Sequence, residues 1–190
     1  MNRASKTILA GLFAVATLGF LSTAPAKEPA PAPTVATATL HGHEKNEKIT
    51  GTVVFTAETG GVKVVADVEG LTPGSHGFHI HQLADLSKPD FSGAGPHWNP
   101  GGHKHGAPDA AEHHAGDLGN LVADDKGHAH LELVLTGVTI EGKEGVVGHS
   151  VIVHAKPDDL HSQPAGDSGA RIAGGVIKAE TEAADSTPKP

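Results

Sequence analysis

The chain has 190 residues and a formal net charge of −8, with no basic stripe and no cysteine. The length favours one domain, and the charge argues against nucleic acid as a partner. The absence of cysteine excludes disulfides, thiolate metal sites and a cysteine nucleophile. The 25 glycines, 13 prolines and 15 histidines point to short strands, many turns and imidazole chemistry.

The first 26 residues are predicted to be a signal peptide. Arg3 and Lys6 form a basic start, residues 8–21 are apolar, and Ala24-Pro25-Ala26 fits a cleavage site. The apolar run is short for a membrane-spanning helix, so we expect no stable membrane insertion after leader removal; an uncleaved anchor is the alternative. We therefore expect a protein of the periplasm or of the cell exterior.

The remaining chain divides into a spacer, one domain and a tail. Residues 27–33 (KEPAPAP) predict a Pro/Ala-rich spacer, and residues 179–190 a disordered tail. In residues 34–178, apolar side chains alternate with period two between turns rich in glycine and proline. This pattern favours an all-β, eight-stranded Greek-key barrel or sandwich of the immunoglobulin-like type. The expected strands lie near residues 34–42, 48–57, 61–69, 76–82, 117–123, 128–136, 149–155 and 171–177.

Two intervals, residues 82–116 and 157–170, lack the strand pattern. Long loops within a compact domain usually serve a function or hold an ion, so we expect two long functional loops. Many of the histidines fall in these loops or beside them.

The first candidate metal ligands are His79 and His81, which lie two residues apart on an expected strand. This spacing places both imidazoles on one face, as a half-site for copper or zinc. A surface histidine pair is the alternative interpretation. His154 ends another expected strand, and only the tertiary fold can bring it to His79 and His81.

The long loop then presents a set of residue types that suits a closed tetrahedral zinc site. The set has three histidines and one carboxylate, and glycines and prolines between them let the loop fold around an ion. Spacing alone does not show whether His114 or His113 is the ligand. A histidine-rich loop that binds metal ions loosely, as a metal buffer, is the alternative interpretation. The set is His97, His105, His114 and Asp117.

Six motifs closely resemble those of the copper,zinc superoxide dismutases, and they occur in the order of that family. The resemblance runs from about Thr34 to Ile177. The motifs are GFHIH (77–81), GPHWNP (95–100), KHG (104–106), HAGDLGN (114–120), VHAKPDDL (153–160) and GARIAGGVI (169–177).

The resemblance implies one copper and one zinc per subunit, with His97 bridging the two metals. It selects His114 over His113 as a ligand. It assigns no metal-binding role to eight further histidines, which are expected to lie at the surface. The implied copper ligands are His79, His81, His97 and His154, and the implied zinc ligands are His97, His105, His114 and Asp117. The histidines left without a role are His41, His43, His103, His113, His128, His130, His149 and His161.

The implied reaction is dismutation of superoxide to dioxygen and hydrogen peroxide, with Arg171 and His97 as catalytic residues. Asp158 is expected to join His79 to His105 and so to orient both rings. Arg171 is expected to hold the small anion beside the copper, and it also suits a hydrogen-bonding role that pins the loop. The alternatives are a non-catalytic superoxide-dismutase-like metal-binding protein of the periplasm, a histidine-rich metal buffer and a β-sandwich interaction module.

The chain departs from the family where other members carry a disulfide. Phe91 and Gly174 occupy the matching positions, and we expect Phe91 to pack over Gly174 in place of the bridge. The loop concerned commonly borders the dimer contact in this family, so a homodimer and a monomer both stay open.

Overall fold

The computed structural model describes residues 34–180, which form an antiparallel sheet of nine strands. All eight predicted strands are present within two residues of their expected bounds at each end. The strands are β1 (Val35–Gly42), β2 (Thr50–Glu58), β3 (Gly61–Glu69), β4 (Gly74–His81), β5 (Asp117–Ala123), β6 (Ala129–Thr136), β7 (Ser150–His154), β8 (Arg171–Val176) and β9 (Lys178–Ala179).

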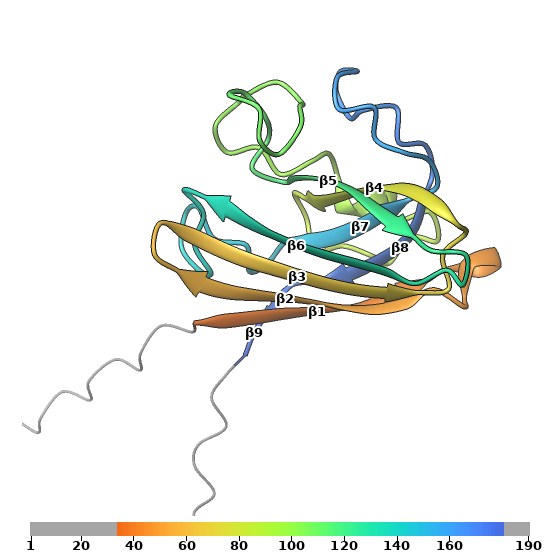
Figure 1. Cartoon of the computed structure of the whole chain (residues 1–190). Helices are drawn as coiled ribbons and strands as arrows, with labels where there is room; N and C mark the ends of the chain where they lie inside the picture. Colours follow the sequence, from red (N-terminus) through yellow and green to blue (C-terminus); the bar gives the residue numbers. More distant parts are fainter. Residues whose placement is uncertain (1–33, 181–190) are drawn as a thin grey trace, which may run out of the picture. The chain divides into compact units, whose positions relative to one another are not determined.

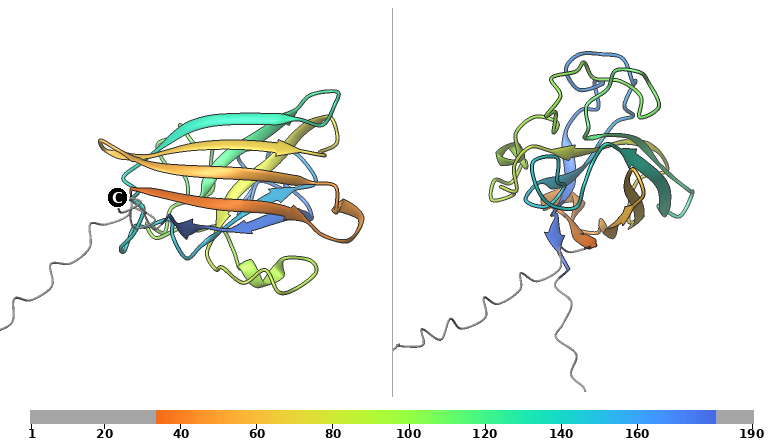
Figure 2. Two further views of the ribbon diagram at one scale, coloured as in Figure 1. Left: turned by 90° about the horizontal axis from the view of Figure 1, so that it is seen from below. Right: turned by 90° about the vertical axis from the view of Figure 1, so that its left-hand side faces the viewer.

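The sheet curls into a nearly closed barrel (Figures 1 and 2). Its order is β5-β4-β7-β8-β1-β2-β3-β6, and the end strands β5 and β6 approach each other. Several consecutive strands pair with each other, but β3 and β4, and likewise β6 and β7, are not neighbours, so the connections are of the Greek-key type. The predicted all-β fold class is confirmed.

The short strand β9 was not predicted. It pairs with β1, and the backbone N–H of Glu180 donates to the carbonyl of Val35 at 2.9 Å. The paired part of the chain therefore extends into the first residues of the predicted tail. The predicted leader and spacer (1–33) and residues 181–190 lie outside the described residues.

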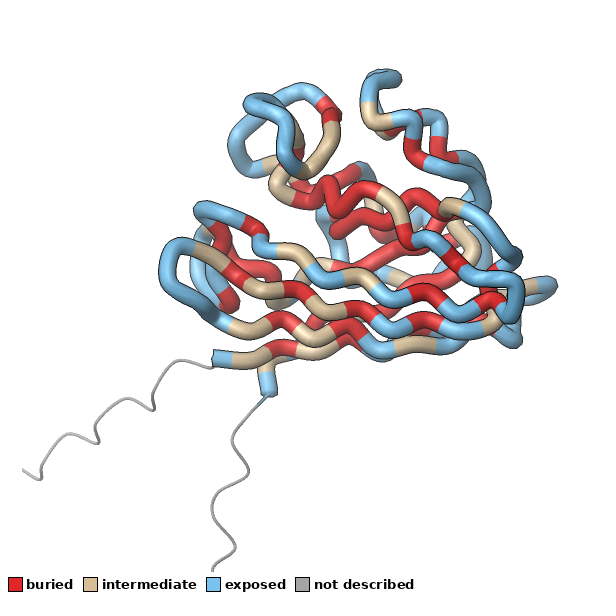
Figure 3. The backbone as a smooth tube through the Cα atoms, viewed as in Figure 1, coloured by how far each residue is buried: buried red, intermediate tan, exposed pale blue. Residues whose placement is uncertain are grey.

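Buried and exposed residues alternate along the strands, and the buried ones form the barrel interior (Figure 3). In β3, Val62, Val64, Ala66 and Val68 are fully buried, whereas the residues between them are partly or fully exposed. One face of the strand therefore fills the barrel and the other faces solvent. Within residues 34–180 the only helices are two 3₁₀ turns, Glu44–Asn46 and Ser92–Ala94, and no helix there is long and apolar enough to cross a membrane.

Strands β4 and β7 differ from this pattern because they are buried on both faces. Phe78 and Ile80 of β4 pack in the barrel core, whereas His79 and His81 point to the opposite face and are still no more than 1% exposed. The long loops, residues 82–116 and 157–170, supply the cover on that outer face. The candidate metal ligands therefore lie between the barrel wall and its loops.

Backbone pairing brings distant candidate residues together at one place. His79 pairs with Asp117, His81 bridges to His97, and His154 pairs with Arg171. The His79–Asp117 pairing follows a bulge in β5, where Gly119 has a φ of +78°. This left-handed conformation favours glycine, so the sequence DLGN both permits the bulge and places Asp117 opposite His79.

Candidate metal centre

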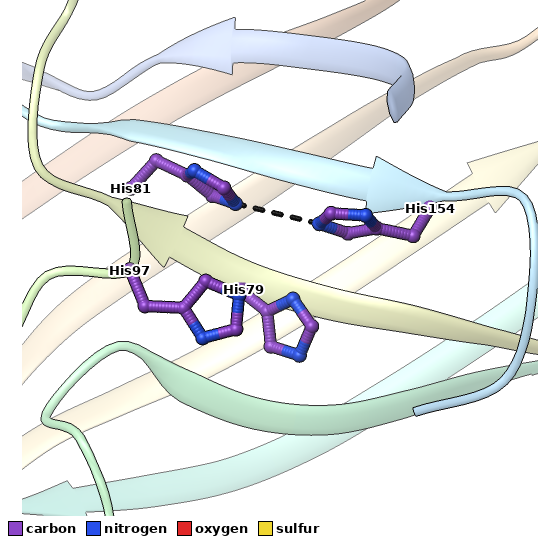
Figure 4. Close-up of side chains that lie close together, drawn as sticks. All are labelled: His79, His81, His97 and His154. Carbon is purple, nitrogen blue, oxygen red and sulfur yellow. Dashed lines mark hydrogen bonds between the residues drawn. The ribbon is translucent and has the colours of Figure 1, made fainter. Parts of the chain in front are cut away.

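Four histidines from β4, β7 and the loop after β4 converge beside the paired strands β4 and β7, with His81 and His154 pointing toward each other from opposite ends of the pair (Figure 4). Each offers one ring nitrogen, and these nitrogens all lie within 4.8 Å of one another. The Nε2 atoms of His81 and His154 are 3.4 Å apart. The group comprises His79, His81, His97 and His154.

In each of these rings the second nitrogen is held by a fixed partner. His81 Nδ1 donates to the carbonyl of Gly95 at 2.8 Å, and His154 Nδ1 lies 3.2 Å from that of Gly169. His79 Nε2 lies 2.7 Å from Asp158 Oδ2, and His97 Nδ1 lies 2.8 Å from Asp117 Oδ1. The partners fix the tautomers and leave one lone pair per ring facing the centre of the group.

The inward nitrogens of two of these rings have no protein partner. His79 Nδ1 and His97 Nε2 are buried and accept no hydrogen bond. Burial also lowers the pKa of His79 to about 4 and that of His154 to about 3, so both rings are neutral at pH 7. Neutral imidazoles with orphaned, convergent lone pairs are the ligands that copper and zinc take, so the group fits a metal ion.

A second group shares His97 with the first and centres on Asp117. The Nδ1 atoms of His97, His105 and His114 lie 2.8, 3.0 and 3.2 Å from Asp117 Oδ1. The other oxygen, Oδ2, accepts from the backbone N–H of His114 at 2.8 Å and of Gly106 at 3.1 Å. The group therefore has three imidazole nitrogens and one positioned carboxylate oxygen, the donor set of a tetrahedral zinc site.

The electrostatics of this second group favour positive charge. Burial lowers the pKa of His105, but its contacts with Asp117 and Asp158 outweigh burial and raise it to about 9. Burial raises the pKa of Asp117, yet hydrogen bonds from the three histidines hold it far below its usual range. A buried carboxylate kept ionised among imidazoles suits a divalent cation.

Asp158 connects the two groups, where the sequence predicts it. Its Oδ2 lies 2.7 Å from His79 Nε2, and its Oδ1 lies 3.0 Å from His105 Nε2. Asn120 of β5 binds the Asp158 backbone on both sides, accepting its N–H at 2.7 Å and donating to its carbonyl at 2.9 Å. The carboxylate is thus anchored to the barrel while it orients one ring of each group.

Arg171 lies beside the first group and is held in place by the long loop. Its Nη1 donates to the carbonyl of Phe91 and its Nη2 to that of Gly95, both at 2.6 Å. A cavity of about 670 Å³ is lined by Arg171, His81, His97 and His154 among others. A small anion in this cavity would meet a fixed guanidinium next to the rings of His81, His97 and His154.

Phe91 and Gly174 lie in the same region, as the sequence predicts, but the contact differs from the expected one. The side chains nearest to a Cβ built on Gly174 are those of Ile152 and Leu86, at 2.9 and 3.4 Å. Phe91 is 5% exposed and clusters with Ala94 and Ile152. Phe91 thus joins an apolar cluster around Gly174, with Ile152 and Leu86 covering the glycine.

Within residues 34–180 the remaining histidines belong to neither group. His113 Nδ1 lies 2.8 Å from the carbonyl of its neighbour His114, so the two rings of this pair have different environments. His76, to which the sequence assigned no role, is buried and binds the carbonyl of His154 at 2.8 Å. Sequence reasoning also missed Asn120, because a carboxamide that binds backbone carries no spacing pattern.

The fold and this site define a β-barrel protein with two adjoining groups of side chains that could each hold a metal ion, and comparisons with known proteins agree. The family model of copper/zinc superoxide dismutase matches residues 49–177. Superoxide dismutase [Cu-Zn] 2 of Brassica juncea is 42% identical over 139 residues, which cover 70% of this chain and 91% of that protein. The crystal structure of the clock protein EA4 covers 82% of this chain and 100% of its own, with 35% identity and a TM-score of 0.73.

The chain therefore belongs to the copper/zinc superoxide dismutase family. This family uses copper and zinc, and the two groups of metal-binding side chains are consistent with both.

We expect Phe91→Ala to destabilise the protein, because it opens a cavity in the apolar cluster around Gly174 and Ile152. The loss should be about 3–4 kcal/mol, the lower part of the range for a buried phenylalanine. Thermal unfolding measures it, and Phe91→Leu should retain most of the stability. Leu83→Ala is a matched control because Leu83 is 51% exposed. An unchanged melting temperature for Phe91→Ala would show that the cluster does not hold the loop.

Proposed function

We propose that this protein dismutates superoxide to dioxygen and hydrogen peroxide, with one copper and one zinc per subunit. The ligands assigned to copper are His79, His81, His97 and His154, and those assigned to zinc are His97, His105, His114 and Asp117. The main support is the convergence of four ring nitrogens beside Arg171, in a chain that belongs to this family.

Bound copper supplies a one-electron redox couple, whereas zinc has none, so zinc serves structure and charge. The two groups also differ in access. Three of the four residues assigned to copper, His81, His97 and His154, line the cavity. Of the residues assigned to zinc, the shared His97 and His114 line it, whereas His105 and Asp117 do not. The more accessible site suits the metal that meets substrate, and the more enclosed one suits a structural ion.

His97 is the residue through which the chain supplies a proton near the substrate. Its Nδ1 lies in the zinc group beside Asp117, and its Nε2 faces the copper group without a protein partner. Nε2 would be among the ligands that hold copper, and the same atom could hold a proton for a substrate in the cavity. The overall reaction balances as two superoxide ions and two protons giving one dioxygen and one hydrogen peroxide.

Arg171 binds and orients the anion. Two loop carbonyls hold its guanidinium at the cavity wall. A fixed cation attracts superoxide and disfavours neutral molecules of similar size, although the formal charge of the whole chain is −8. The local field beside the copper ligands thus opposes the net charge.

His154→Ala should abolish superoxide removal and copper binding while zinc stays bound, because His154 belongs only to the first group. The purified protein is reconstituted with both metals, assayed for superoxide removal and analysed for metal content. His128→Ala is the control, since His128 is exposed and belongs to neither group. Full activity of His154→Ala would refute the copper assignment, and a wild-type protein that binds both metals without activity would favour the non-catalytic alternative.

Arg171→Ala should lower kcat/KM for superoxide by about 10-fold or more and weaken its dependence on salt, because the anion loses its guanidinium. Arg171→Lys keeps the charge but not the planar fork to two carbonyls, so an intermediate value is expected. Stopped-flow kinetics over a range of ionic strength measures both. Identical kcat/KM values for the three proteins would remove Arg171 from substrate binding.

We also propose that the protein acts in the periplasm or at the cell exterior after removal of residues 1–26. The basic start, short apolar run and Ala24-Pro25-Ala26 support this. Mass spectrometry of the exported protein should give an N-terminus at Lys27. Recovery of the intact chain from the membrane fraction would favour an uncleaved anchor instead.

A further inference from the structure

The side chain of Gln163 joins the two long loops at a single residue, His105. Its Oε1 accepts the backbone N–H of His105 at 2.9 Å, and its Nε2 donates to the backbone carbonyl of the same residue at 2.9 Å. Nε2 also donates to the carbonyl of His161 within its own loop, at 3.1 Å. One carboxamide therefore fixes the backbone of His105 and the turn that carries Gln163 itself.

The same loop approaches His105 at its ring as well. Asp158 Oδ1 binds His105 Nε2 at 3.0 Å, and Gly166 passes directly over this contact. A Cβ on Gly166 would overlap Asp158 Oδ1 and lie 2.7 Å from His105 Nε2. Residues 157–170 are thus shaped to close on His105 from two directions, on the backbone and on the ring.

Gln163 takes no part in the barrel. It is exposed, it lies in no strand, and the backbone groups it binds belong to a loop residue whose nearest strand begins at Asp117. Its contacts are therefore not needed to pack the core. Their main effect is to fix the position of the His105 imidazole.

We propose that Gln163 is a positioning residue for zinc, holding His105 ready for the ion through its backbone. The proposal rests on the zinc assignment made above and extends it to a residue that touches no metal. Three of the four assigned zinc ligands, His97, His105 and His114, come from one loop. Such a site binds more tightly when its ligands are ordered before the ion arrives.

The test uses the full chain loaded with zinc and the variant Gln163→Met, which keeps the length of the side chain and loses its hydrogen bonds. Zinc release to a colorimetric chelator should be about 10-fold faster, at the low end of effects for residues that orient a ligand. The visible spectrum of the cobalt(II)-substituted site should change in the variant, because His105 is less well oriented. The melting temperature should fall more for the zinc-loaded protein than for the metal-free protein.

His161→Ala is the matched control, because it removes a neighbouring exposed side chain and leaves the carbonyl that Gln163 binds. It should release zinc at the rate of the unaltered protein. Unchanged zinc release by Gln163→Met, an unchanged cobalt spectrum, or an equal fall in both melting temperatures would overturn the proposal. None of these readouts measures superoxide removal, so failure of the proposed activity would be detected separately.

Discussion

The burial of six imidazole rings beneath two loops is the constraint on which the rest of the site depends. None of the six is more than 7% exposed. Burying a polar ring costs free energy unless its nitrogens have hydrogen-bond partners. The fixed contacts of these rings therefore offset the cost of burying them. The carbonyl of Gly95 binds one ring nitrogen of His81, and Asp158 binds one nitrogen each of His79 and His105. Asp117 Oδ1 faces one nitrogen of each of the three rings in the second group. His79 Nδ1 and His97 Nε2 are left buried without a protein partner, which suits a metal ion at the centre of the first group.

The loop that supplies most of these groups is held without a disulfide. Phe91 inserts its side chain into the apolar cluster with Ile152, while its carbonyl accepts from Arg171. Arg171 also donates to Gly95, whose carbonyl accepts from His81 Nδ1 as well. Apolar packing, the guanidinium and a proposed copper ligand are therefore mechanically connected, so a disturbance at Phe91 would reach His81.

The sequence predicts the strands well because their alternation reports a local property, the burial of one face. It also places His79 and His81 together, since that pairing depends only on the strand period. It does not distinguish His114 from His113, because the choice depends on how the loop turns back onto Asp117; the family resemblance was needed there. The roles of Gln163 and Asn120 cannot be predicted from the sequence for a related reason. Their amides recognise backbone groups of residues far away in the chain, and no spacing encodes such contacts.

His97 belongs to both groups, so the positions of their side chains depend on each other. Its ring is held on one side by Asp117, which also faces His105 and His114, and on the other side it completes the group at the cavity. Any movement of the loop that carries His97, His105 and His114 would therefore shift His97 Nε2, the atom proposed to carry a proton to the substrate. Asp158, which binds His79 and His105 together, constrains the same movement from the opposite loop. The more enclosed group thus constrains the geometry of the group beside Arg171, where three of the four histidines line the cavity.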